Sequence, residues 1–158
     1  MPRRRSHRVL FCLAGIYNLA WGLHAVIDPD ALFRFAGMPP ARYPEVWACL
    51  GMVIGLYGIV YLEIARAPEQ GFVHAAVGLL GKVLGPIGWT VLVLSGRWPV
   101  TTVVLIVTND LVWWYPFGRY LRDAWPSFRQ QLQHHRTTGG PSSPEPGKEL
   151  TRTTTPAW

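Results

Sequence analysis

Hydrophobic residues along this chain fall into four long runs that are separated by short polar segments. The runs cover residues 9–27, 46–64, 72–94 and about 99–121. A helix of about 20 apolar residues is long enough to cross the hydrocarbon core of a bilayer. A soluble domain could bury one such run, but a chain of 158 residues has little left to cover four. The pattern therefore predicts an all-α fold, a bundle of four transmembrane helices.

The first connection, residues 28–44, predicts a short helix of its own. Asp28 is suited to cap it, Pro29 to its first position and Gly37 to its end. Because the segment also carries several apolar side chains, we expect this helix to lie on the outer membrane surface.

The later connections, residues 65–71 and 95–98, are short, so the spans that they join should be antiparallel neighbours. Residues 1–8 form a basic N-terminal segment, and residues 122–136 form a second basic segment after the last span. Residues 137–158 are rich in Thr, Ser, Pro and Gly without apolar periodicity, which predicts a disordered tail.

The formal net charge of +6 comes from basic residues near the two ends, beside the apolar runs. Four spans place both termini on one side of the membrane. With cytoplasmic termini, eleven Lys and Arg residues lie inside and three outside, which predicts an N-in, C-in protein of the bacterial inner membrane. The inside set is Arg3, Arg4, Arg5, Arg8, Arg66, Arg119, Arg122, Arg129, Arg136, Lys148 and Arg152, and the outside set is Arg34, Arg42 and Arg97. This distribution favours anionic lipids over nucleic acid as the partner of the basic termini.

A cleaved signal peptide is the alternative interpretation of the N-terminus, since it also begins with basic residues. The first apolar run is too long for a signal peptide, however, and no Ala-x-Ala spacing precedes Asp28. We therefore expect the first run to remain as a membrane span.

Two charged residues interrupt the apolar runs. Lys82 lies ten residues after Phe72, at a depth of about 15 Å, and Asp110 lies eleven residues after Pro99, at about 16 Å from the opposite face. Both depths are near the middle of a hydrocarbon core of about 30 Å. Ionisable groups at this depth are costly and usually functional, so the pair predicts an ion pair within a polar site.

Two amides join this site. Asn109 is adjacent to Asp110, and Asn18 reaches a comparable depth in the first run. Pro86 deprives the carbonyl of Lys82 of its helical partner, which adds an unpaired acceptor at this level. We interpret the four residues as a site that binds a small polar or quinone-like ligand or relays protons. The alternative is a polar lock that fixes the register of the helices.

Glycines recur every three or four residues in the second and third runs. Such stripes let helices approach closely, either within one chain or toward a second copy or a membrane-complex partner. The stripes are Gly51, Gly55 and Gly58 in one run, and Gly78, Gly81, Gly85 and Gly88 in the next.

The histidines and cysteines give little support to redox chemistry. His24 and His74 are expected at opposite membrane faces, so they cannot both ligate one haem in a monomer, and His74 is instead predicted to pair with Glu63. Cys12 and Cys49 are likewise expected near opposite faces, too far apart for a disulfide. The sequence therefore predicts no metal and no resident cofactor, with quinone or haem as the alternative.

Two strings have the character of signatures, GKVLGPIG at residues 81–88 and NDLVWWYPF at residues 109–117. Together with the layout of residues 9–121, they resemble the DoxX-like group of small four-span bacterial membrane proteins. DoxX is named as a small subunit of a quinone-linked oxidase, so the resemblance implies a respiratory or redox-linked role. Lys82 and Asp110 have no counterpart in a DoxX motif.

Three functions follow from these features. The first is a non-enzymatic membrane protein with a buried Lys/Asp/Asn site. The second is an accessory or assembly subunit of a quinone-linked redox complex. The third is a small transporter that works as an oligomer, because four spans enclose little space. No phosphate-binding loop or nucleophile elbow is present to indicate an enzyme.

Overall fold

The computed structural model describes residues 1–138, and side chains through residue 134. Every regular element in this part is helical. The elements are α1 (Arg4–Ile27), α2 (Ala31–Phe35), α3 (Pro44–Arg66), α4 (Phe72–Leu94), the 3-10 turn η1 (Val100–Thr102), α5 (Val103–Ile106), the π-helical η2 (Val107–Leu111) and α6 (Val112–Thr138). Four helical stretches are long and apolar enough to cross a membrane: Arg4–Ile27, Pro44–Arg66, Phe72–Leu94 and Val100–His134. The predicted all-α fold with four such helices is confirmed.

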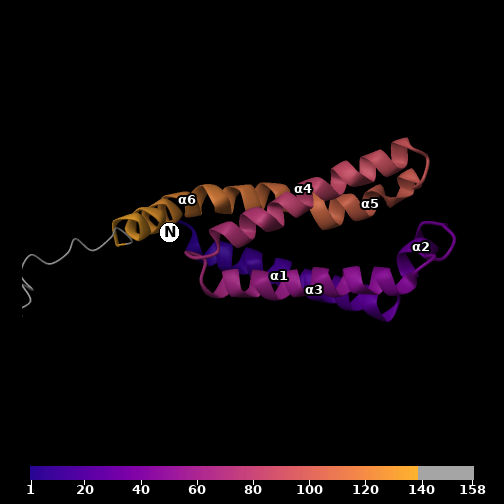
Figure 1. Cartoon of the computed structure of the whole chain (residues 1–158), viewed down its shortest axis with the longest axis horizontal. Helices are drawn as coiled ribbons and strands as arrows, with labels where there is room; N and C mark the ends of the chain where they lie inside the picture. Colours follow the sequence, from indigo (N-terminus) through magenta and orange to yellow (C-terminus); the bar gives the residue numbers. More distant parts are fainter. Residues whose placement is uncertain (139–158) are drawn as a thin grey trace, which may run out of the picture.

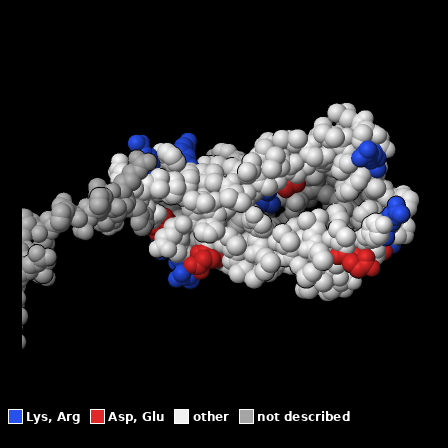
Figure 2. All heavy atoms as spheres, in the orientation of Figure 1, with Lys and Arg blue, Asp and Glu red and all other residues white. Residues whose placement is uncertain are grey.

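Large apolar side chains cover the outside of the long helices. Leu94 is 83% exposed and Ile27 is 73% exposed, and many Leu, Ile and Val side chains between them are more than half exposed. Charged residues gather toward the two ends of the molecule, while the surface between them carries few (Figure 2). So much apolar surface is stable in lipid but not in water. This distribution indicates a multi-pass membrane protein.

The long helices form two pairs. Helices α1 and α3 lie side by side, and α4 lies along α5, η2 and the first part of α6 (Figure 1). The first pair is held by direct backbone contact: a Cβ atom on Gly22 would lie 2.5 Å from the carbonyl oxygen of Gly51, and one on Gly58 would lie 2.8 Å from that of Gly15. These glycines therefore let α1 and α3 of the same chain approach closely, as small residues do in membrane helices.

An aromatic cluster joins the two pairs at the end that carries the N-terminus. The ring of Phe11 on α1 lies 4.6 Å from Tyr120 and 4.9 Å from Phe117, both on α6, and Tyr61 on α3 lies 5.3 Å from Phe117. The Tyr120 hydroxyl donates to the carbonyl of Pro68, between α3 and α4, at 2.7 Å. Toward the other end the pairs diverge (Figure 1). The molecule is therefore closed at one end and open at the other.

The fourth span differs from the single helix expected over residues 99–121. It begins as η1 and a short α5, passes through the π turn η2, and continues as α6 through Pro116 and Pro126. The basic segment 122–136 thus prolongs the same helix. The predicted tail, residues 137–158, begins inside α6 and from residue 139 lies outside the described residues.

The short helix expected in the first connection is present as α2. Its N-cap residue is Asp30, not Asp28, and no side chain caps it. Asp28 instead accepts hydrogen bonds from the guanidinium of Arg34, which lower the pKa of its carboxyl group. Gly37 follows the helix with a φ of 66°, a left-handed conformation that suits glycine and ends the helix.

Candidate functional site

A cleft of about 380 Å³ opens between the two helix pairs. Figure 2 shows this hollow, with basic and acidic atoms inside it. All four polar residues predicted to form a site line the cleft. The complete lining is Asn18 from α1; Leu50, Val53, Ile54, Tyr57 and Tyr61 from α3; Val77, Gly78, Gly81, Lys82 and Gly85 from α4; and Asn109 and Asp110 from η2. The cleft therefore combines mainly apolar walls with a few convergent polar groups, as ligand sites do.

The ammonium of Lys82 is the basic group of the cleft. The residue is 6% exposed, and its Nζ donates to the backbone carbonyl of Asn109 at 2.7 Å. The same Nζ lies 5.6 Å from the centre of the Trp113 ring, within cation–π range. An ammonium has three N–H donors. The hydrogen bond to Asn109 uses one of them, which leaves donors for a ligand.

The carboxylate of Asp110 is the acidic group. It is also 6% exposed and accepts a hydrogen bond of 3.2 Å from the side-chain amide of Asn109. Gly85 gives it room, since a Cβ atom there would lie 3.0 Å from Oδ2. The described ion pairs do not include Lys82 with Asp110, so the direct ion pair that we expected is not formed.

The π turn explains this difference. A π turn widens the helix by one residue and displaces backbone groups from the regular α-helical ladder. Here it contains both Asn109 and Asp110, and the carbonyl of Asn109 receives the ammonium of Lys82. Lys82 and Asp110 line one cleft, and the ammonium bonds to a backbone carbonyl of η2 in place of the carboxylate. Such turns occur frequently at functional sites.

Pro86 shapes the same level of α4. Proline has no N–H, so the carbonyl of Lys82 lacks the helical donor that it would otherwise find at residue 86. The indole Nε1 of Trp114 donates to this carbonyl at 3.0 Å. The broken ladder of α4 is thus completed from α6, and the two helices are fixed together at the depth of the cleft.

Some polar groups in the cleft, or beside its lining residues, were not predicted from the sequence. Tyr57 and Tyr61 line it from α3, one turn apart, and the indole Nε1 of Trp113 is buried without a hydrogen-bond partner in the described part of the chain. The spacing of the two tyrosines within an apolar run was the available signal. The partnerless Trp113 could not be recognised without the fold.

The second predicted pair, Glu63 and His74, lies apart from the cleft. Both residues line a smaller pocket of about 280 Å³ between α3 and α4. The carboxylate of Glu63 accepts hydrogen bonds of 2.8 Å and 2.5 Å from Arg66 on its own helix. The described hydrogen bonds of Glu63 are therefore with arginine and not with histidine.

The glycine stripes divide between inside and outside. Gly51 and Gly58 contact α1, so that stripe packs within the chain. On α4, Gly78 faces the hydroxyl of Tyr61, whereas a Cβ atom on Gly81 or Gly88 would meet nothing within 4 Å. Of the two glycine stripes, only Gly81 and Gly88 on α4 therefore leave space that a partner helix could use.

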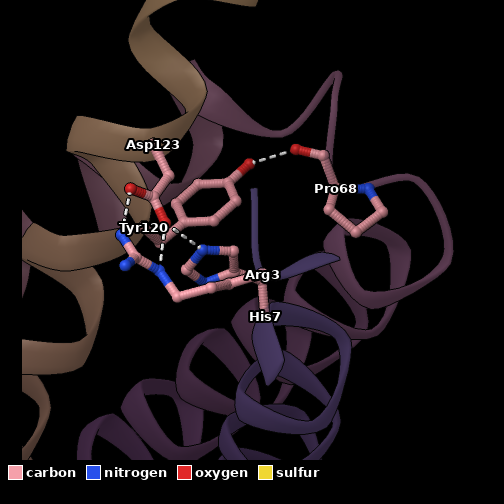
Figure 3. A network of polar contacts seen from close by, with 5 residues as sticks. All are labelled: Arg3, His7, Pro68, Tyr120 and Asp123. Carbon is pink, nitrogen blue, oxygen red and sulfur yellow. Dashed lines mark hydrogen bonds and ion pairs between the residues drawn. The ribbon is translucent and has the colours of Figure 1, made fainter. Parts of the chain in front are cut away.

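A polar network that the sequence did not reveal closes the other end of the molecule (Figure 3). The buried carboxylate of Asp123 accepts hydrogen bonds from Arg3 at 2.9 Å and 2.5 Å, and lies 2.8 Å from Nε2 of His7. The His7 ring packs edge-on against Tyr120. These contacts fasten the start of α1 to α6, which identifies a structural role for the network.

Within the described residues, no group of three His, Cys, Asp or Glu side chains could hold a metal ion. Cys12 and Cys49 are both free and exposed. The chain matches no protein-family model, no curated protein and no solved structure. The resemblance to the DoxX-like group accordingly stays a prediction, and the function has to be argued from the cleft.

Proposed function

We propose that this chain is an N-in, C-in protein of the bacterial inner membrane whose cleft binds a small ligand with a polar head and an apolar body. A quinone-like molecule belongs to this class. One observation carries the proposal: Asn18 from α1, Lys82 from α4, and Asn109 and Asp110 from η2 line one cleft of about 380 Å³. Buried ionisable groups at membrane depth are costly and usually mark a site of function.

The chemistry of the cleft suits such a ligand. The ammonium of Lys82 can donate to a carbonyl or carboxylate oxygen, and the carboxylate of Asp110 can accept from a hydroxyl group. The rings of Tyr57 and Tyr61 offer flat apolar surface with polar tips. The same pair of ionisable groups could pass a proton to or from the bound head group, so proton relay is part of the proposal.

The walls of the cleft favour entry from the lipid. Val53 on α3 and Val77 on α4 line the cleft and are 51% and 46% exposed. A ligand dissolved in the bilayer could therefore enter between the helix pairs without crossing an aqueous phase. Its apolar body would lie along these side chains, and its head would reach Lys82.

The divergence of the two pairs favours a second candidate, an accessory or assembly subunit of a quinone-linked redox complex. A helix of a partner could occupy the open end, where Gly88 on α4 has nothing within 4 Å of its Cβ position. A transporter would have to be an oligomer, because the cleft lies within one small chain.

The first experiment is an absorption spectrum and a native mass spectrum of the full-length chain, purified in mild detergent. A retained molecule of quinone size, or a visible chromophore, is the expected result. A colourless protein that carries only phospholipid would contradict the ligand proposal and favour the partner-subunit candidate. Copurification of a stoichiometric membrane protein would support that candidate directly.

A further inference from the structure

A second groove lies at the N-terminal end of the molecule, away from the cleft. It runs between the first turns of α1 and the last turns of α3 and has a volume of about 550 Å³. Three arginines form its polar part, and the remaining walls are mainly apolar. The lining, which we call the arginine groove, is Arg5, Arg8, Val9, Cys12, Leu13, Leu62, Ala65 and Arg66. No carboxylate belongs to it.

The neighbouring arginines, Arg3 and Arg4, are paired with carboxylates, whereas the arginines of the groove keep N–H donors that are free to bind a ligand. Arg3 binds Asp123, and Arg4 binds Glu69 at 2.7 Å. Arg5 is exposed and has no partner in the part of the chain that the structure describes. The N-terminal end of the molecule therefore carries positive charge at Arg5 in the arginine groove that no carboxylate of the described residues neutralises.

The remaining two arginines are held in place at the groove. Arg8 donates from Nε to the carbonyl of Ala65 at 3.1 Å, a bond that leaves its two terminal nitrogens for another acceptor. Arg66 is bound to Glu63 through Nε and one terminal nitrogen. A guanidinium fixed in this way is well suited to an anionic oxygen, because little side-chain freedom remains to be lost.

The apolar part of the groove indicates what carries the anion. Val9 and Leu13 follow Arg5 and Arg8 along one side of α1 and are 54% and 58% exposed. The groove therefore changes from basic to apolar in the direction in which α1 enters the membrane. A free phosphate would use only the basic part.

We propose that the arginine groove binds an anionic phospholipid, with its phosphate at Arg5 and Arg8 and an acyl chain along Leu13 and Leu62. Basic pockets beside membrane helices bind lipid head groups in this way. The site is separate from the cleft and does not depend on its function.

The test measures lipids that the full-length chain retains in native mass spectrometry. The protein is incubated with equal amounts of phosphatidylglycerol and phosphatidylcholine that carry the same acyl chains. We expect preferential retention of phosphatidylglycerol, reduced about fivefold for each arginine removed in Arg5→Gln plus Arg8→Gln. The matched control, Arg119→Gln plus Arg122→Gln, removes the same charge from α6 and should retain the wild-type preference.

Several outcomes would overturn the proposal. Equal retention of the two lipids would show no selectivity, and an equal loss in both double variants would indicate diffuse attraction to a basic surface. Displacement of the lipid by millimolar inorganic phosphate would indicate a plain anion site. If Arg8→Gln unfolds the chain because the bond to Ala65 is lost, the single variant Arg5→Gln is tested in its place. Arg5 has no described contact to lose, so an unchanged preference for phosphatidylglycerol in this variant would overturn the proposal.

Discussion

At the scale of single residues, Pro86 and Trp114 determine how α4 and α6 meet beside the cleft. Pro86 removes the helical donor to the carbonyl of Lys82, and the indole of Trp114 replaces it at 3.0 Å. We expect Trp114→Phe to lower the free energy of unfolding by about 1 kcal/mol, since it leaves this carbonyl without a donor.

Pro86→Ala provides the control for that variant. It restores an N–H at residue 86, so the carbonyl of Lys82 regains a helical partner. Trp114→Phe should then cost clearly less in the Pro86→Ala background than in the wild type. Unfolding in mixed micelles with a denaturing detergent measures all four proteins, and an equal cost in both backgrounds would contradict the role of Trp114.

Asp123 is the second residue whose contacts lead to a prediction. Its buried carboxylate holds Arg3 and lies 2.8 Å from His7, which links the N-terminus to α6. We expect Asp123→Asn to reduce the free energy of unfolding by about 2 kcal/mol, because hydrogen bonds to charged groups are lost or weakened.

The matched control for Asp123 is Glu63→Gln. Glu63 also binds an arginine, but that pair is exposed on both sides, so the change should cost at most about 1 kcal/mol. The same detergent titration compares the two variants. Equal effects would mean that the network in Figure 3 does not stabilise the closed end.

At the scale of elements, the glycines distinguish a packed helix pair from an open helix face. A Cβ atom on Gly22 would lie 2.5 Å from the carbonyl oxygen of Gly51 and 2.7 Å from the backbone nitrogen of Gly55, so Gly22→Ala must push α1 and α3 apart. We expect a loss of about 2 kcal/mol, typical of an overpacked contact.

Gly88→Ala is the corresponding control on α4. Nothing lies within 4 Å of the added methyl group, and alanine favours a helix over glycine by about 1 kcal/mol. The variant should therefore be as stable as the wild type or slightly more so in the same unfolding assay. Destabilisation of similar size at both positions would contradict the assignment of packed and open faces.

The elements themselves were largely predictable, because apolar runs of this length allow few structures other than helices. The sequence placed α3 and α4 within about two residues, and it predicted a short helix before residue 37. It did not reveal the π turn in the fourth span. A π turn depends on which backbone and side-chain groups compete for partners across helices, and Asn109 and Asp110 meet those partners only in the folded protein.

At the scale of the whole molecule, the structure consists of two helix pairs that are joined at one end and apart at the other (Figure 1). The depths of Lys82 and Asp110 could be counted from the sequence, which is why both were placed at one level. The missing ion pair between them could not be predicted, because it depends on the π turn η2, which places the carbonyl of Asn109 against the ammonium of Lys82. The buried contacts of Arg3, His7 and Asp123 also arise only when residues more than a hundred positions apart meet.

The central claim is that the cleft around Lys82 and Asp110 holds a ligand and is not merely a lock between helices. The most direct test is native mass spectrometry of the double variant Lys82→Met plus Asp110→Leu, with Asp28→Leu plus Arg34→Met as a control that removes an opposite-charge pair outside the cleft. We predict that the wild type and the control retain the same small molecule, while the cleft variant stays helical and loses it. Retention of that molecule by the folded cleft variant would contradict the account.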